Sequence, residues 1–110
     1  MKKGSRVLPV IYANNAIREL EVIADWNERT YSRAHAKSYI AFLEQHIDAL
    51  GKNHAKGKPV STRPDLRYIE IRRKTGGNSH FAIYSVDDQA VNLLHVFHNA
   101  QDWQNKLAEE

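Results

Sequence analysis

Histidines and arginines in the second half of the chain lie close enough in sequence to do chemistry together. Histidine titrates near neutral pH, so it can act as a general acid, a general base or a metal ligand. Arginine binds carboxylates and phosphates through a planar fork of donors. With one tyrosine, these are the residues whose chemistry has to be explained: Arg67, Arg72, Arg73, His80, Tyr84, His95 and His98.

The histidines do not form a metal or catalytic motif. His95 and His98 are three residues apart, and in a strand such residues point to opposite faces, so they are not expected to share a metal. His80 directly follows Ser79, and neighbours on a strand also diverge, so no serine triad is expected there. Cysteine is absent, which excludes disulfides, thiolate metal sites and a cysteine nucleophile. We therefore expect no metal, no cofactor and no catalytic residue, and histidines that are polar positions of a sheet.

The positive charge of the chain is concentrated in one segment. The whole sequence has 16 basic and 13 acidic residues, a net charge of +3. Residues 51–74 alone hold eight basic and two acidic residues, a local net charge of +6. Such a field suits an acidic or polyanionic partner, although a solvated loop rich in lysine is the commoner origin of the pattern. The arginines favour a binding role, and strand alternation places Arg67 and Arg73 on one face and Arg72 on the other.

The elements that must position these residues begin with a strand and two helices. Residues 7–12 are a short β-prone run with Pro9, which predicts an edge strand because proline cannot donate to a ladder. An asparagine pair can cap a helix over residues 14–29, and a serine can cap a second over residues 32–50, which a glycine ends. Apolar residues at helical spacing predict the buried faces. These are Ile17, Leu20, Ile23, Ala24 and Tyr31 in the first helix and Ala36, Tyr39, Ile40, Leu43, Ile47 and Leu50 in the second.

Beyond the second helix the apolar pattern alternates, as in strands. Residues 51–64 hold two glycines and two prolines and are predicted to be a loop. Three predicted strands follow, separated by turns at 75–78 and 87–89: residues 66–73, 79–86 and 90–98. The last strand is apolar on both faces, as near a sheet centre. One face is expected to carry Val91, Leu93 and Phe97, and the other Leu94 and Val96.

This order, β-α-α-β-β-β with a short C-terminal helical segment at residues 102–107, predicts the α+β fold class. A helical hairpin is expected to pack on a small antiparallel β-sheet, which the first strand rejoins. The 110 residues, 12.7 kDa, fit one domain over residues 1–110. No apolar run reaches the ~20 residues of a membrane span, and the basic start is not followed by the apolar stretch of a signal peptide. We therefore expect a cytoplasmic protein with no membrane partner.

Several blocks of the sequence carry a pattern known from other proteins. In the first helix they are an alanine, an acidic residue with a leucine, an isoleucine and an aromatic residue: Ala16, Glu19, Leu20, Ile23 and Trp26. In the sheet they are Leu66-Arg67, His80 to Asp88, Leu94 to His98, and Asp102-Trp103. From about Val10 to Leu107, the chain thus resembles the RelE/ParE superfamily of bacterial toxins from type II toxin–antitoxin systems. The resemblance implies the fold predicted above.

Within this superfamily the resemblance favours the ParE-like branch. RelE-type toxins cut messenger RNA in the ribosome with lysines, arginines and a tyrosine or histidine on the sheet. At the matching positions this chain has other residues: Tyr68 and Glu70 for lysines, Phe81 and Asn99 for arginines, and Trp103 for a tyrosine. ParE-type toxins poison DNA gyrase without those residues. The resemblance therefore implies a toxin that inhibits DNA gyrase, and it favours this binding role over an enzymatic one.

The resemblance also implies partners and surfaces. A cognate antitoxin is expected to contact the helical hairpin, with candidates Leu20, Trp26, Tyr39 and Leu43, and such pairs can form higher-order assemblies and stabilise plasmids. The candidates for contact with the target are Arg67, Arg72, Arg73, His80, Tyr84, His98 and Trp103. Two alternatives stay open. One is a RelE-type ribosome-dependent mRNA endoribonuclease, and the other is a non-catalytic nucleic-acid-binding module that uses the basic strand on phosphates.

Overall fold

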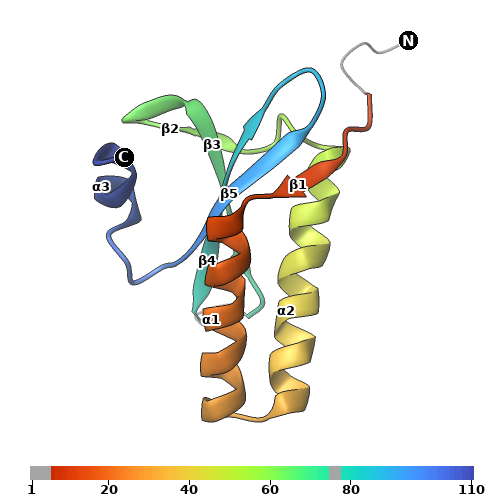
Figure 1. The fold of residues 1–110 in the computed structure, drawn as a ribbon, viewed down its shortest axis with the longest axis vertical. Helices are drawn as coiled ribbons and strands as arrows, with labels where there is room; N and C mark the ends of the chain where they lie inside the picture. The colour runs from red at the N-terminus through yellow and green to blue at the C-terminus, as the bar shows by residue number, and fades with distance from the viewer. Residues whose placement is uncertain (1–5, 75–77) are drawn as a thin grey trace.

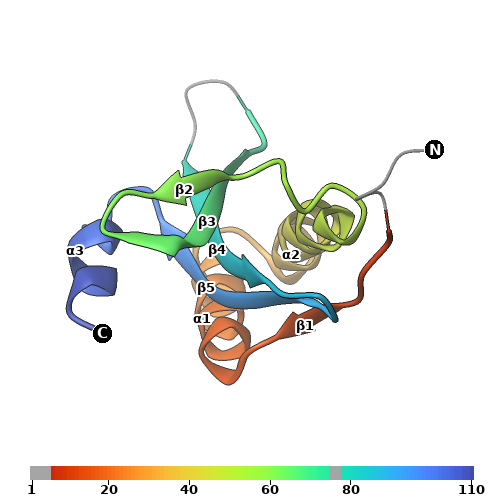
Figure 2. The ribbon, with the colours of Figure 1, turned by 90° about the horizontal axis from the view of Figure 1, so that it is seen from above.

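Two long helices cover one face of a five-stranded sheet, and a short helix lies on its other face (Figures 1 and 2). The computed structural model describes residues 6–74 and 78–110. The strands are β1 (Val10–Tyr12), β2 (Lys58–Val60), β3 (Arg63–Arg72), β4 (Ser79–Val86) and β5 (Val91–His98), and the helices are α1 (Asn14–Thr30), α2 (Arg33–Asp48) and α3 (Trp103–Ala108). The predicted α+β fold class, with a helical hairpin packed on a sheet, is confirmed.

The second helix forms as its sequence predicts. Ser32 caps α2, because its hydroxyl oxygen accepts a hydrogen bond from the His35 N–H at 3.0 Å. The buried positions of α2 follow the predicted stripe: Ala36, Tyr39, Leu43 and Ile47. The helix continues into a 3₁₀ turn, η1 (Ala49–Gly51), which ends at Gly51. A Cβ atom at this position would lie only 2.5 Å from the Leu8 carbonyl oxygen. Only glycine therefore lets the chain before β1 pack against the end of the hairpin.

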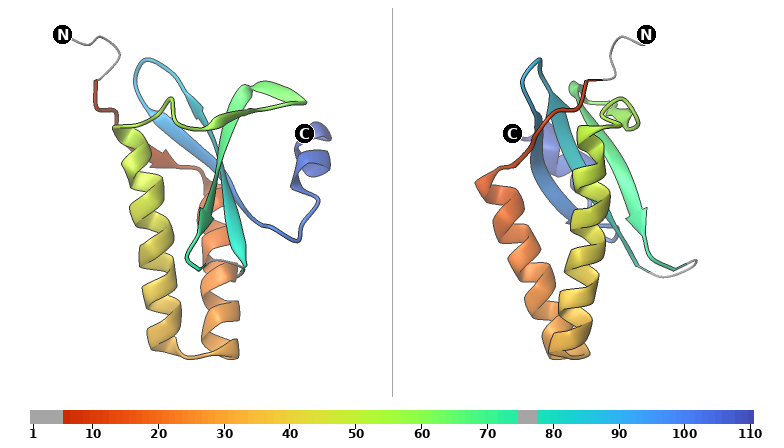
Figure 3. Two further views of the ribbon diagram at one scale, coloured as in Figure 1. Left: turned by 180° about the vertical axis from the view of Figure 1, so that it is seen from behind. Right: turned by 90° about the vertical axis from the view of Figure 1, so that its right-hand side faces the viewer.

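The first helix is rotated relative to its predicted buried face. Ile17 and Tyr31 were expected in the core but are 42% and 60% exposed. The buried positions are Ala16, Leu20 and Asn27. Asn27 is tolerated in this stripe because its side-chain amide donates to the Ile23 carbonyl at 2.8 Å. The predicted asparagine cap is also wrong, since Ala13 precedes the first turn and no side chain caps it. Figure 3 shows α1 and α2 side by side, joined at the end of the hairpin that lies away from β1.

The sheet has the order β1-β5-β4-β3-β2 and is mixed rather than wholly antiparallel. β1 is an edge strand, as its proline predicted, but it pairs in parallel with the first three residues of β5. The other neighbours pair antiparallel. Residues 51–64, predicted to be a loop, contain β2. Its Pro59 is tolerated because β2 is the opposite edge strand, and this composition concealed the strand. In the predicted turn at 75–78, residues 75–77 lie outside the described residues.

A bulge in β5 changes which side chains share a face. Ile83 lies opposite His95 and the next residue, Tyr84, lies opposite Leu93, so Leu94 is the extra residue. Leu93 and Val96 therefore face the helical hairpin together, and Leu94 and Phe97 face α3. The predicted grouping of Leu93 with Phe97, and of Leu94 with Val96, was wrong because strict alternation does not survive a bulge.

The sheet separates two apolar clusters. The cluster under the hairpin comprises Ala16, Leu20, Tyr39, Leu43, Ile47, Ile71, Ala82, Leu93 and Val96. The cluster under α3 comprises Val60, Leu66, Ile83, Phe97, Trp103 and Leu107. Burying a large apolar side chain contributes about 1.5–3 kcal/mol to folding. The two clusters therefore hold the hairpin on one face of the sheet and α3 on the other. Within the described ranges, the helices are too short or too polar to cross a membrane.

Candidate functional site

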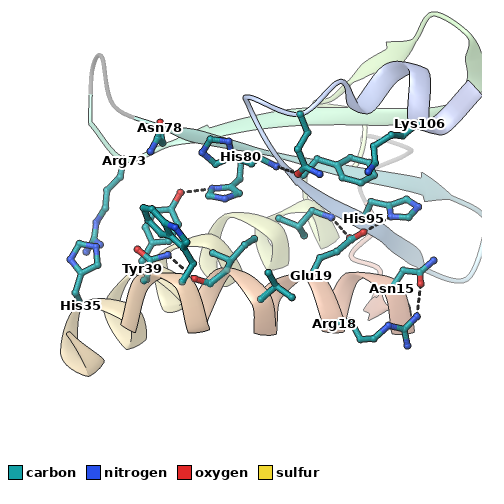
Figure 4. Close-up of a pocket in the computed structure, with 18 of the residues that line it drawn as sticks. Asn15, Arg18, Glu19, His35, Tyr39, Arg73, Asn78, His80, His95 and Lys106 are labelled. Atoms are coloured by element: carbon teal, nitrogen blue, oxygen red, sulfur yellow. Dashed lines mark hydrogen bonds and ion pairs between the residues drawn. The ribbon is translucent and has the colours of Figure 1, made fainter. Parts of the chain in front are cut away.

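A groove with a volume of about 1230 Å³ runs along α1 beside β5 (Figure 4). α2 and the residues that follow β3 contribute to it as well, and α3 and the last residue of the chain line part of its wall. The groove brings together four of the six histidines: His35, His80, His95 and His98. Sequence reasoning named three of them but had no means of placing them in one groove.

His80 is buried in the groove and contacts two ionisable side chains. Its Nδ1 lies 2.6 Å from the Tyr39 hydroxyl, and its ring lies 5.2 Å from the His98 ring. Burial and, to a lesser extent, the nearby His98 lower the pKa of His80 to about 4. Burial also raises the pKa of Tyr39. The imidazole is therefore neutral near pH 7, and it shares a hydrogen bond with the tyrosine hydroxyl.

His95 connects three parts of the chain. Its Nδ1 lies 2.9 Å from a carboxylate oxygen of Glu19 in α1, and its Nε2 lies 2.9 Å from a carboxylate oxygen of Glu110. The hydrogen bond to Glu19 is the main cause that raises the pKa of His95, against the effect of burial. The second oxygen of Glu19 accepts a hydrogen bond from the Val96 N–H at 2.8 Å. α1, β5 and the C-terminal residue are thus joined by one polar network.

The groove does not gather metal ligands. His95 stacks on the Phe97 ring at 4.7 Å, whereas His98 meets His80. In residues 6–74 and 78–110, no three side chains of the ligating types are close enough together to hold a metal ion.

The α1 wall of the groove exposes apolar side chains. Val22 is 67% exposed and Trp26 is 46% exposed, one turn apart on the helix. The Trp26 ring meets the Tyr31 ring edge-on at 5.9 Å, and Tyr31 lies 4.4 Å from the His35 ring. A row of exposed apolar and aromatic groups beside a groove is typical of a surface that binds a partner.

The hairpin residues expected to bind the antitoxin do not all lie on this surface. Leu20, Tyr39 and Leu43 are buried in the cluster between the hairpin and the sheet. Tyr39 nevertheless lines the groove, and Trp26 is the member of the predicted set that is exposed. Val22 was missed, although its spacing of four residues from Trp26 was visible in the sequence.

The three arginines do not form one patch. Arg67 donates to the Gly57 carbonyl at 2.5 Å. Arg73 donates to the Ser38 hydroxyl and lies 5.4 Å from the Phe42 ring. Arg72 forms an ion pair with Glu70 at 2.6 Å. Arg67 lies in the middle of β3 and reaches the residue before β2, whereas Arg73 follows the end of β3 and reaches α2.

Two other target candidates serve the core. The Tyr84 hydroxyl donates to the His54 carbonyl and accepts from the Gly57 N–H, both at 2.9 Å, and the side chain is fully buried. Trp103 is 6% exposed, and its ring lies 5.1 Å from both the Tyr68 and the Phe81 rings. Arg72 and Arg73 are the exposed members of the predicted set, and Arg67 and His98 are partly exposed.

Comparison with known proteins points to one family. The family model described as ParE toxin of type II toxin-antitoxin system, parDE, matches residues 10–103. Among solved structures, the chain is similar to a chromosomal ParDE TA system from P. aeruginosa, with a TM-score of 0.72 and 15% sequence identity. That match covers 86% of this chain and 98% of the other, and at this identity it establishes a shared fold. None of the curated proteins matches the sequence.

Proposed function

The chain belongs to the ParE toxin family of type II toxin–antitoxin systems, and from this premise we propose that it inhibits DNA gyrase and is neutralised by a cognate antitoxin. It acts by binding and not by cutting nucleic acid. Membership of the family implies an antitoxin partner. The geometry of the site bears on two further questions: whether the toxin cuts RNA, and which of its surfaces the antitoxin covers.

The packing of Tyr68, Phe81 and Trp103 is the observation that carries this proposal. These residues stand where the RelE pattern has two basic residues and a tyrosine, and in this chain they form an aromatic cluster under α3. Cleavage of RNA needs proton transfer and a cation beside the phosphate. These side chains, whose rings are packed 5.1–5.9 Å apart, supply no cation, and Glu70 nearby is held by Arg72 and Ser79. This favours the gyrase-directed branch over the endoribonuclease.

The groove beside α1 is the proposed antitoxin surface. Its wall offers Val22 and Trp26 to an apolar side chain, and the groove lies on the helical hairpin that was expected to bind the antitoxin. We assign the target contact to Arg67, Arg72, Arg73 and His98, because these candidates stay at least partly exposed in the fold. Arg73 and His98 also line the groove, so a bound antitoxin would cover part of this surface.

Two assays on the purified protein test this function. We expect inhibition of gyrase supercoiling and accumulation of cleaved DNA, with no codon-phased cuts in ribosome-bound messenger RNA. The product of the adjacent small reading frame, added in equal amount, should restore supercoiling. Codon-phased cuts without any effect on gyrase would instead establish the endoribonuclease. Salt-sensitive binding to bare duplex DNA with neither activity would indicate a nucleic-acid-binding module.

A further inference from the structure

Tyr84 is a buried tyrosine whose hydroxyl holds the connection between α2 and β2. The hydroxyl donates to the His54 carbonyl and accepts from the Gly57 N–H, both at 2.9 Å. The Gly57 carbonyl in turn accepts a hydrogen bond from Arg67 at 2.5 Å. A Cβ atom at residue 57 would lie 2.5 Å from the Tyr84 hydroxyl oxygen, so only glycine allows this close approach. Residues 52–58 are therefore fixed from inside the protein, although most of them are exposed.

The fixed segment presents cations that have no acidic partner. Lys52, Lys56 and Lys58 are exposed, and none of them forms an ion pair with a carboxylate in the part of the chain that the structure describes. Lys58 begins β2, the edge strand at the opposite side of the sheet from β1 (Figure 2). Asp65, an acidic residue of the neighbouring strand β3, is already bound by Arg63 at 3.3 Å. This edge therefore offers positive charge to a partner.

The chemistry of this edge fits a nucleic acid better than a protein. In the described chain, the large apolar side chains that are exposed all lie outside residues 52–65. Protein interfaces are usually centred on apolar or aromatic groups and are poor in lysine. Contacts to a phosphate backbone come from lysine, arginine and hydroxyl groups. Ser61 and Thr62, at the turn between β2 and β3, add two exposed hydroxyls to the edge.

We propose that this edge binds the phosphates of the duplex DNA on which gyrase acts, and that Tyr84 is the residue that positions it. The phosphate-binding groups are Lys52, Lys56, Lys58 and Arg67. The guanidinium of Arg67 uses one nitrogen on Gly57 and has further donors for a phosphate oxygen. The proposal rests on the proposed function, because gyrase brings the DNA and the toxin together. Phosphate contacts carry no sequence information, so binding does not depend on base sequence.

Removing two of the lysines tests the phosphate contact. Each neutralised phosphate contributes about −0.9 to the slope of log K against log salt. For a short fluorescent duplex, Lys56→Gln with Lys58→Gln should make this slope shallower by about 1.8, measured by anisotropy between about 50 and 300 mM salt. Arg33→Gln with Lys37→Gln removes the same charge from two exposed positions of α2 and should keep the wild-type slope. Equal slopes for the two double variants would overturn the phosphate contact.

Tyr84→Phe tests the positioning role, since it keeps the ring and every charge but loses the hydroxyl. The Gly57 N–H and the His54 carbonyl then lose their partner, and the segment between them is no longer preorganised. We expect the duplex affinity to fall roughly three- to tenfold with the salt slope unchanged. Variant and wild type are compared at a temperature at which circular dichroism shows both folded. Wild-type affinity in Tyr84→Phe would overturn the positioning role.

The gyrase assay separates this inference from the proposed function. Lys56→Gln with Lys58→Gln should need about tenfold more toxin for half-inhibition of supercoiling, whereas the control pair on α2 should not. Full potency of the lysine variant would overturn the inference and leave gyrase inhibition intact. Lost potency without any change in duplex binding would place an acidic surface of gyrase on this edge, which also overturns it. A wild-type toxin without effect on gyrase would overturn the proposed function, and salt-sensitive duplex binding would still establish the phosphate-binding edge.

Discussion

At the residue scale, His80 shows how folding changes what a side chain can do. From sequence it was a candidate contact for the target, and histidine is charged about half of the time near pH 6.5. In the fold it shares a hydrogen bond with Tyr39, and burial together with the nearby His98 lowers its pKa to about 4. It is therefore a neutral structural group that holds α2 to the sheet.

This environment predicts a loss of stability in mild acid. Between pH 6.5 and 4 the unfolded chain binds a proton on His80 that the folded chain does not, so unfolding becomes easier as the pH falls. We expect the free energy of unfolding to drop by about 1–2 kcal/mol between pH 7 and 5 from this group. His80→Gln keeps an acceptor for Tyr39 and does not titrate, so urea denaturation should show a smaller drop.

His95 provides an internal contrast to that measurement. Its pKa is raised, chiefly by Glu19, so its contribution to stability is fully present below its ordinary pKa of 6.5 and is lost as the pH rises through the raised value. It cannot cause an acid loss. If His80→Gln loses as much stability between pH 7 and 5 as the wild type does, the acid sensitivity arises elsewhere.

At the scale of elements, the two tryptophans have different roles: one stabilises the fold, and the other is placed to bind a partner. Trp103 anchors α3 to the sheet and is almost fully buried, whereas Trp26 stands on the exposed wall of α1. Trp103 therefore anchors a helix to the sheet, whereas Trp26 is available for contact with a partner.

Replacing each tryptophan by alanine should give opposite results. Trp103→Ala leaves a cavity under α3, and we expect a loss of about 3 kcal/mol in the free energy of unfolding. Trp26→Ala should change stability by no more than about 0.5 kcal/mol but weaken antitoxin binding by about tenfold or more, as for an aromatic residue at the centre of an interface. Denaturation and calorimetric titration on both variants measure this. Unchanged antitoxin affinity in Trp26→Ala would place the antitoxin on another surface.

At the scale of the whole molecule, charge is distributed unevenly. Residues 51–74 carry a net charge of +6 in a chain whose total is +3. These residues run from the end of η1 through β2 and β3. β2 is an edge strand of the sheet and β3 is its neighbour. A field of this kind acts at long range on an acidic partner, which is attracted before any specific contact forms.

This field predicts that salt slows antitoxin association more than it speeds dissociation. Between 50 and 500 mM salt we expect the association rate constant to fall about tenfold, with a much smaller change in the dissociation rate. Lys56→Gln with Lys58→Gln should reduce the salt dependence, and both lysines are exposed. Lys37→Gln, an exposed lysine of α2, is the control. Stopped-flow mixing measures the rates, and a salt-independent association rate would contradict steering by this segment.

The sequence by itself determined the fold class and the order of the helices and strands other than β2, which its proline and glycine content concealed. The helical stripe of α2, the edge position of β1 and the three long strands followed from periodicity and from proline chemistry. Periodicity did not fix which face of α1 is buried, because two neighbouring stripes of this helix both have helical spacing. α1 buries Ala16 in place of Ile17, because a small side chain lets the helix approach the sheet and both positions lie near the same stripe.

Only the tertiary structure decided which side chains meet. The extra residue Leu94 in β5 moves Val96 to the face of Leu93. The strand-to-helix contact of Glu19 with Val96 joins residues 77 positions apart. The arginines that clustered in sequence reach different partners: Arg67 reaches Gly57, Arg72 reaches Glu70 and Arg73 reaches Ser38. A periodic pattern reports the faces of one element, whereas contacts between elements depend on their rotation, on bulges and on the reach of single side chains, which no periodicity encodes.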